Sequence, residues 1–224
     1  VDEGNDSVAL GTSTANPTQL ELTVNGVVDT SLPPIAANTV GSVVIIGSDG
    51  ANSIDLSAVN PTDFSFTDPV TGDPLQILVD AGNGDDTLIA SSGFNDTLMG
   101  GHGDDVISPG ALPVATVTLT FDGGDGADTL TGGPAADILI GGDGDDLITG
   151  NGANDNIDGG DGEDNIDAGD GDDTVSAGEG ADTVVGGPGD DSILGGDGED
   201  VLSGNDGDDT LNGGVRNDSL DGGF

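Results

Sequence analysis

Aliphatic residues recur at every ninth position along the C-terminal half of the chain. The residues on either side of each are mostly Thr, Ser, Asn or Asp, a pattern that predicts a short strand with one inward-facing side chain. The phase holds without a gap from Gly123 to Asp221, over eleven nine-residue units. The aliphatic residues, eighth in each unit, are Leu130, Leu139, Ile148, Ile157, Ile166, Val175, Val184, Ile193, Leu202, Leu211 and Leu220.

The sixth position of the same units is always Asp. The first position is always Gly or Ala, and the fourth is Gly in eight of the eleven units. A random tract rich in Gly and Asp would not keep two residue classes in phase over this length, so the pattern indicates an internal repeat of a six-residue turn and a three-residue strand. The Asp residues are Asp128, Asp137, Asp146, Asp155, Asp164, Asp173, Asp182, Asp191, Asp200, Asp209 and Asp218.

Two such units form one coil, with strands on opposite sides and turns at both edges. Coils stacked about 4.8 Å apart, the spacing of neighbouring strands, bring each sixth-position Asp beside the Asp two units away. Asp146 is therefore expected near Asp128 and Asp164. The predicted fold class is all-β, a parallel β-roll or β-helix solenoid preceded by a degenerate β cap region.

Looser copies of the unit occur upstream. Units that start at Ala81 and Gly100 place Asp86 and Asp105 in the sixth position, and another unit starts at Ser91. No helix of any length is evident in the sequence.

Before residue 81 the pattern is more degenerate. Val43–Ile46 and Leu75–Val79 are predicted strands, and Asn25–Gly26 is predicted to form a hairpin turn. Gly47–Asp55 and Val1–Ala9 retain parts of the repeat.

These patterns predict four segments. Residues 1–80 form a degenerate β-roll and β cap region, and residues 81–108 form the first repeats. Residues 109–122 form a β insert in which Val117, Leu119 and Phe121 alternate with Thr. Residues 123–224 form the regular roll.

The charge of the chain restricts its partners. It has 44 acidic residues, one Arg and no Lys, a formal net charge of −43. A basic surface for nucleic acid or for an anionic membrane cannot be built from one Arg, and no apolar stretch is long enough to span a membrane. This much negative charge favours multivalent cations as partners.

Calcium is the cation that this composition favours. It accepts six to eight oxygen ligands from carboxylates and backbone carbonyls, whereas magnesium prefers a small octahedron with several waters. Zinc is disfavoured because the chain has no Cys and one His, His102. Since one aliphatic side chain per nine residues makes a small core, we predict that the calcium-free chain is expanded and disordered.

The units GGDGADTLT, GGDGDDLIT, GGDGEDNID and GGDGEDVLS resemble the RTX, or hemolysin-type calcium-binding, nonapeptide repeat. The resemblance is highly specific over residues 123–221 and good over 81–108. It implies a parallel β-roll with one calcium ion between like turns, in a protein exported by bacteria that folds outside the cell, on or near the cell surface.

The resemblance also implies the ligands, which are the sixth-position carboxylates and the backbone carbonyls of the turn. The implied carbonyls are those of the first to fourth positions, and the candidate residues named here hold the first and third positions. The implied first-position residues are Gly123, Gly141, Gly159, Ala168, Ala177, Gly186 and Gly195. The implied third-position residues are Asp143, Asp161, Asp170, Glu179 and Asp197.

Four turns depart from the family pattern, at five positions. Ala135, Ala153 and Arg216 replace Gly at the fourth position, and Asn151 and Asn205 replace it at the second. Asn tolerates a left-handed backbone whereas Ala and Arg do so poorly, so the calcium sites at these turns are expected to be weak or vacant.

The leading functional hypothesis is a structural one. A calcium-stiffened rod would form part of an extracellular filament, surface layer, matrix or adhesin stalk, with Gly222–Phe224 of one copy stacked head-to-tail on Val1–Ala9 of the next. The alternative is a secretion and folding module of a larger exported enzyme or toxin. Catalysis by the repeats is not expected, because their carboxylates form rows without a pocket. A glycan-binding role is disfavoured by an aromatic content of 2%.

Outward-facing apolar residues leave one question open. Six apolar residues occupy strand positions that should face solvent: Ile138, Ile140, Leu147, Val185, Leu194 and Val201. Either the N-terminal segment or the insert covers them, or they form a lateral contact between subunits.

Overall fold

The computed structural model describes residues 7–12, 19–24, 27–28, 35–36, 42–47, 49–57, 76–91, 93–110 and 117–224. Over these ranges the regular structure consists of β-strands alone, which confirms the predicted all-β class. No helix that could cross a membrane occurs in this part of the chain.

The strands of the described residues form two sheets, one of 13 strands and one of nine. The 13-stranded sheet contains β1 (Ser7–Thr12), β2 (Gln19–Val24), β3 (Val27–Val28), β4 (Ile35–Ala36), β6 (Ser53–Asp55), β8 (Thr87–Ile89), β10 (Val106–Ser108), β12 (Thr129–Thr131), β14 (Leu147–Thr149), β16 (Asn165–Asp167), β18 (Thr183–Pro188), β20 (Val201–Asp206) and β22 (Ser219–Asp221). The nine-stranded sheet contains β5 (Ser42–Ile46), β7 (Gln76–Asn83), β9 (Asn95–His102), β11 (Thr120–Asp125), β13 (Ile138–Asp143), β15 (Asn156–Asp161), β17 (Thr174–Glu179), β19 (Ser192–Asp197) and β21 (Thr210–Val215).

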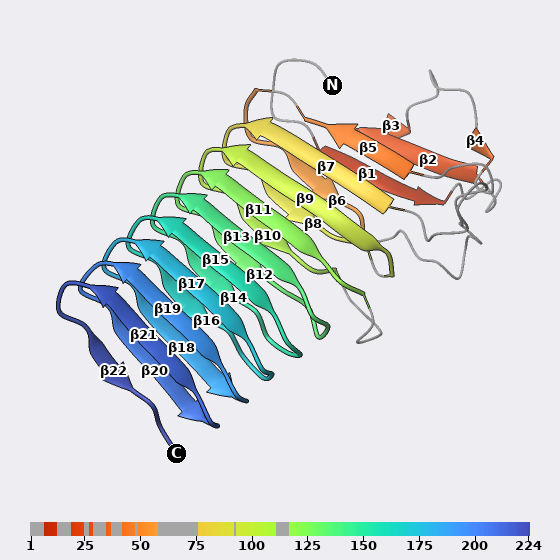
Figure 1. Ribbon diagram of the computed structural model, residues 1–224. Coiled ribbons are helices and arrows are strands. Elements are labelled where there is room, and N and C mark those ends of the chain that lie inside the picture. Colours follow the sequence, from red (N-terminus) through yellow and green to blue (C-terminus); the bar gives the residue numbers. More distant parts are fainter. Residues whose placement is uncertain are drawn as a thin grey trace.

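From β5 onward the chain winds as a solenoid between these two sheets (Figure 1). Successive strands alternate between the sheets, and neighbours within each sheet are parallel. The register confirms the nine-residue unit, since Leu139 lies opposite Ile157 and Ile148 opposite Ile166, each eighteen residues further on. The predicted parallel β-roll is therefore the observed fold.

The core of the roll is a narrow stack of the eighth-position side chains. From Leu130 to Leu202 each of these side chains is at most 2% exposed, while the strand residues beside them face outward. Each coil therefore contributes two aliphatic side chains to a core shared only with its neighbours, as in other solenoids.

The segment predicted as a β insert contributes a strand to the roll. Strand β11 includes Thr120–Asp122, and Phe121 lies opposite Leu98 of β9 and Leu139 of β13. Val117, Leu119 and Phe121 are all buried, as their alternation predicted. Residues 111–116 lie outside the described residues.

The N-terminal strands change the sheet from parallel to antiparallel. Val8 of β1 lies opposite Ile54 of β6 in parallel pairing, and opposite Val24 of β2 in antiparallel pairing. Val24 in turn faces Val27 of β3. The predicted hairpin turn at Asn25–Gly26 lies outside the described residues, but the strands on either side of it pair as a hairpin requires.

Four of the outward apolar side chains remain accessible. Ile138, Leu147, Leu194 and Val201 are 39–50% exposed, so no described segment covers them. A lateral contact between subunits through these residues stays a prediction.

Candidate metal centre

The sixth-position Asp residues form two rows, one along each edge of the roll where the chain turns between the sheets. The first row lies in turns that enter the 13-stranded sheet, and the second in turns that enter the nine-stranded sheet. The first row consists of Asp86, Asp105, Asp128, Asp146, Asp164, Asp182, Asp200 and Asp218. The second row consists of Asp137, Asp155, Asp173, Asp191 and Asp209.

Each row is held by hydrogen bonds between consecutive turns. The backbone N–H of Asp128 donates to Oδ1 of Asp146, and the N–H of Asp146 donates to Oδ1 of Asp164, at 2.8 and 2.9 Å. The same bond joins Asp155 to Asp173 in the second row, at 2.7 Å. The predicted neighbours of Asp146 are therefore its observed neighbours.

The second carboxylate oxygen, Oδ2, has no partner in eleven of these thirteen residues. Each of these oxygen atoms is buried and accepts no hydrogen bond from the protein. A buried acceptor without a partner costs about 1–3 kcal/mol, and more when it carries charge. The eleven residues are Asp86, Asp105, Asp128, Asp146, Asp155, Asp164, Asp173, Asp182, Asp191, Asp200 and Asp209.

The unpartnered oxygen faces the first position of its own turn. A Cβ atom on Gly141 would collide with Oδ2 of Asp146 and with the backbone carbonyl of Gly159 in the next coil, so these two oxygens converge beside Gly141. The same two kinds of oxygen converge beside Gly123 and Gly195: Oδ2 of the Asp in the same unit and the first-position carbonyl of the next coil. All of the predicted first-position residues are buried, and the two alanines, Ala168 and Ala177, are 0% exposed.

The third-position residues differ from this arrangement. The side chains of Asp143, Asp161, Asp170, Glu179 and Asp197 are exposed. The carbonyl of Asp143 accepts the N–H of Gly126 at 2.7 Å, and the carbonyl of Asp161 accepts that of Gly144 at 2.6 Å. These carbonyls thus take part in the ladder between coils, and their contribution to a metal site stays a prediction.

The turns owe their shape to left-handed backbone at the second and fourth positions. Gly142 and Gly144 have φ of 122° and 134°. Asn151, Ala153, Asn205 and Arg216 adopt positive φ at the same positions, between 70° and 95°. Among the five departing residues, Ala135 alone does not adopt a positive φ.

Burial raises the pKa of the row carboxylates because desolvation disfavours the charged form. The pKa rises to about 7 for Asp105, Asp146 and Asp155, and to about 6 for Asp164 and Asp191. Neighbouring carboxylates of the same row add to the increase, while the backbone hydrogen bonds oppose it. The rows therefore oppose full ionisation near neutral pH unless a cation accompanies them.

The raised pKa of the row carboxylates predicts how the stability of the metal-free chain changes with pH. Because the folded pKa of Asp146 is about 7 and that of an unfolded Asp is about 3.9, the folded form binds protons more tightly. The resulting stabilisation is complete below about pH 4 and is lost as the pH rises through about 7. Calcium-stripped protein should therefore gain β-structure, measured by far-UV circular dichroism, between pH 8 and 5.5. A β content that stays constant or falls on acidification would contradict the prediction.

Two further positions precede the predicted residues of their own rows. Asp96 is 1% exposed and occupies the second-row position of the unit that starts at Ser91, whose N–H donates to Asp96 Oδ2 at 2.6 Å. Asn52 occupies the first-row position before Asp86 and donates from its amide to the carbonyl of Gly50 at 2.8 Å. Both could be found from the sequence because each is the sixth residue of a nine-residue unit, the units that start at Ser91 and Gly47.

Other polar side chains lie outside the rows. His102 forms an exposed ion pair with Asp125, at 2.7 Å between Nδ1 and Oδ2. Among the described residues, no three His, Asp or Glu side chains converge on a common point. A metal ion in the turns would therefore take most of its ligands from backbone carbonyls.

Comparison with known families matches this geometry. The family described as RTX calcium-binding nonapeptide repeat (4 copies) matches residues 80–111, 122–157, 149–184, 176–211 and 203–224. The chain belongs to this RTX repeat family. The search of curated proteins found no match to the chain.

RTX repeats bind calcium, and the residues present fit that ion. The turns offer buried anionic oxygens without partners next to inward backbone carbonyls, which is the all-oxygen donor set that a hard cation requires. The described turns offer neither thiolate nor imidazole at these points. The chain is therefore a calcium-binding β-roll.

Proposed function

We propose that each row of buried Asp residues holds calcium between consecutive turns, and that this calcium completes the fold of an extracellular structural rod. The sixth-position carboxylates and the first- and third-position carbonyls are the proposed ligands. Bound calcium supplies the positive charge that the rows lack, and the chain supplies the positions of the oxygens.

The observation that carries this proposal is the set of eleven buried Oδ2 atoms without hydrogen bonds. A folded protein normally pairs nearly all of its buried polar atoms, so a regular series of exceptions along two edges requires a common partner. The protein has one Arg and no Lys to pair with these carboxylates. A cation from solution satisfies all of them in the same way.

Two further features support a location outside the cell. Calcium modules of extracellular proteins bind at about 10⁻⁴–10⁻³ M, so such a roll would stay unfolded in the cytosol and fold after export. RTX repeats are also typical of secreted bacterial proteins. A net charge of −43 keeps the unfolded chain expanded until calcium neutralises it.

A structural role follows from the form of the molecule. The repeats build a regular solenoid in which the buried acidic groups lie in rows rather than around a pocket. Such a rod suits a filament, surface layer, matrix or adhesin stalk. Head-to-tail stacking of copies stays a prediction, for which growth of light scattering on addition of calcium is the test.

Matched variants test the proposed ligands. Asp146→Asn removes a buried row carboxylate, and Asp143→Asn removes an exposed carboxylate from the same turn, where only the backbone carbonyl is a proposed ligand. We expect Asp146→Asn to reduce the number of calcium ions bound per chain, measured by equilibrium dialysis, and Asp143→Asn to leave it unchanged. Equal losses in both variants would indicate binding by general charge attraction and contradict the proposal.

A further inference from the structure

One turn of the second row is closed by the protein itself. Asp137 is a buried sixth-position carboxylate, yet both of its oxygens accept hydrogen bonds. Oδ1 accepts the N–H of Leu119 at 2.7 Å, and Oδ2 accepts the N–H of Gly133 at 2.6 Å. The other second-row carboxylates, from Asp155 onward, leave Oδ2 without a partner.

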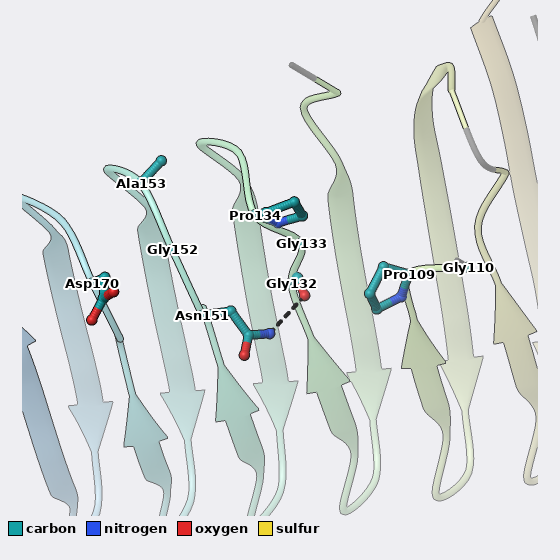
Figure 2. Close-up of a pocket in the computed structure, with 9 residues that line it drawn as sticks. All are labelled: Pro109, Gly110, Gly132, Gly133, Pro134, Asn151, Gly152, Ala153 and Asp170. Atoms are coloured by element: carbon teal, nitrogen blue, oxygen red, sulfur yellow. Dashed lines mark hydrogen bonds between the residues drawn. The ribbon is translucent and has the colours of Figure 1, made fainter. Parts of the chain in front are cut away.

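The first-position carbonyl of the same turn is engaged as well. The side-chain amide of Asn151, in the next coil, donates to the backbone carbonyl of Gly132 at 2.8 Å (Figure 2). Gly132 holds the first position of the Asp137 turn, which elsewhere provides a proposed calcium ligand. Two protein N–H groups thus reach the oxygens that a calcium ion would need.

The backbone of this turn also lacks the shape of the others. No residue from 132 to 137 has a positive φ, and Ala135, at the fourth position, is 5% exposed. In the turn 186–191, Gly187 and Gly189 have φ of 119° and 142°. Both turns begin Gly-Gly-Pro, and within the turn they differ at the fourth and fifth positions, which are Ala135-Ala136 in one and Gly189-Asp190 in the other.

The preceding position in the row offers no carboxylate. Leu119 occupies it, fully buried, just before β11, and Phe121 holds the core position of that strand. A calcium ion between Leu119 and Asp137 would therefore lack one of the two carboxylates that flank the other positions. The first row has no such gap, since Asp128 and Asp146 both keep an unpartnered Oδ2.

We infer that the turn Gly132–Asp137 binds no calcium, so that this coil of the roll is loaded on one edge only, with N–H groups of Gly133 and Asn151 in place of the ion. The inference rests on the proposed function of the other row carboxylates. In the regular array, calcium binding along the second edge then starts at Asp155. At the coil of Asp137, hydrogen bonds rather than a metal ion close the second edge of the roll.

Counting bound calcium in a matched pair of variants tests the inference. Asp137→Asn and Asp191→Asn change equivalent residues in the two Gly-Gly-Pro turns. Native mass spectrometry in saturating calcium should show one ion fewer in Asp191→Asn and the wild-type number in Asp137→Asn. Loss of an ion in both variants would overturn the inference alone. An unchanged count in Asp191→Asn would overturn the proposed function and the inference with it.

A second variant covers the case in which Asp137→Asn does not fold. The double substitution Ala135→Gly and Ala136→Asp gives this turn the sequence of residues 186–191. It should open the turn, release Asp137 Oδ2 from Gly133 and add one calcium ion per chain. A count equal to that of the wild type would contradict the assignment of the Gly133 and Asn151 N–H groups as the groups that take the place of the ion.

Discussion

Removal of calcium at neutral pH is expected to unfold the roll as a whole. Without the ion, eleven buried carboxylate oxygens have no partner and successive Asp residues of each row repel each other. The core cannot offset this cost, because it contains one aliphatic side chain per nine residues. The effect should therefore be loss of most β-structure rather than loosening of a few turns.

Small-angle X-ray scattering with and without a chelator measures this transition. The radius of gyration should rise to about 50 Å, the value for an unfolded chain of this length. Calcium should restore the compact form, whereas magnesium at the same concentration should not, because it prefers a smaller and more rigid octahedron. A chain that stays compact in the chelator at pH 7.5 would show that the rows are stable without metal.

The second large effect is expected from Gly142→Val. Gly142 has φ of 122°, and a Cβ atom there would collide with the backbone carbonyl of Gly124 in the preceding coil. A β-branched residue in this region costs about 1–3 kcal/mol from backbone strain, to which the collision adds. The variant should melt at a clearly lower temperature than the wild type in saturating calcium.

Gly142→Asn is the matched control for this substitution. Asn already occupies the second position at Asn151 and Asn205, with φ of 78° and 74°. We therefore expect Gly142→Asn to lower the melting temperature much less than Gly142→Val. Similar melting temperatures for the two variants would mean that the left-handed second position is not required for stacking of the coils.

Much of the fold could be predicted from the sequence because a solenoid repeats one local rule. The eighth-position aliphatic residue and the sixth-position Asp have a similar environment in most coils, so their spacing alone predicts which residues stack. The observed bond between Asp128 and Asp146 is the direct consequence of that spacing. The backbone conformations of Asn151 and Asn205 also followed from residue type.

The positions that escaped prediction lack the repeat's own residues. Residues 117–122 contain neither Gly nor a sixth-position Asp, so their place in the roll is visible only from the pairing of Phe121 with Leu98 and Leu139. The strand character of this segment was predictable from alternation, but its register depends on stacking against neighbours. Local sequence does not carry that information.

The departures at the fourth position show a similar limit. The sequence predicted poor tolerance of the left-handed region for Ala and Arg, yet Ala153 and Arg216 adopt it, with φ of 70° and 95°. Stacking on neighbouring turns offsets the conformational cost of a left-handed backbone at these two residues. Ala135 instead avoids the region, and its turn closes through Gly133. Residue type alone does not distinguish Ala135 from Ala153.

The central claim is that calcium lies inside the two edges of the roll, beside the unpartnered carboxylate oxygens. An anomalous-difference map from crystals grown in calcium tests it most directly. The account predicts a row of peaks along each edge, about 4.8 Å apart, next to Oδ2 of residues such as Asp146 and Asp173, with no peak at Asp137. Peaks confined to exposed carboxylates such as Asp143, or no peaks at all beside the buried rows, would contradict it.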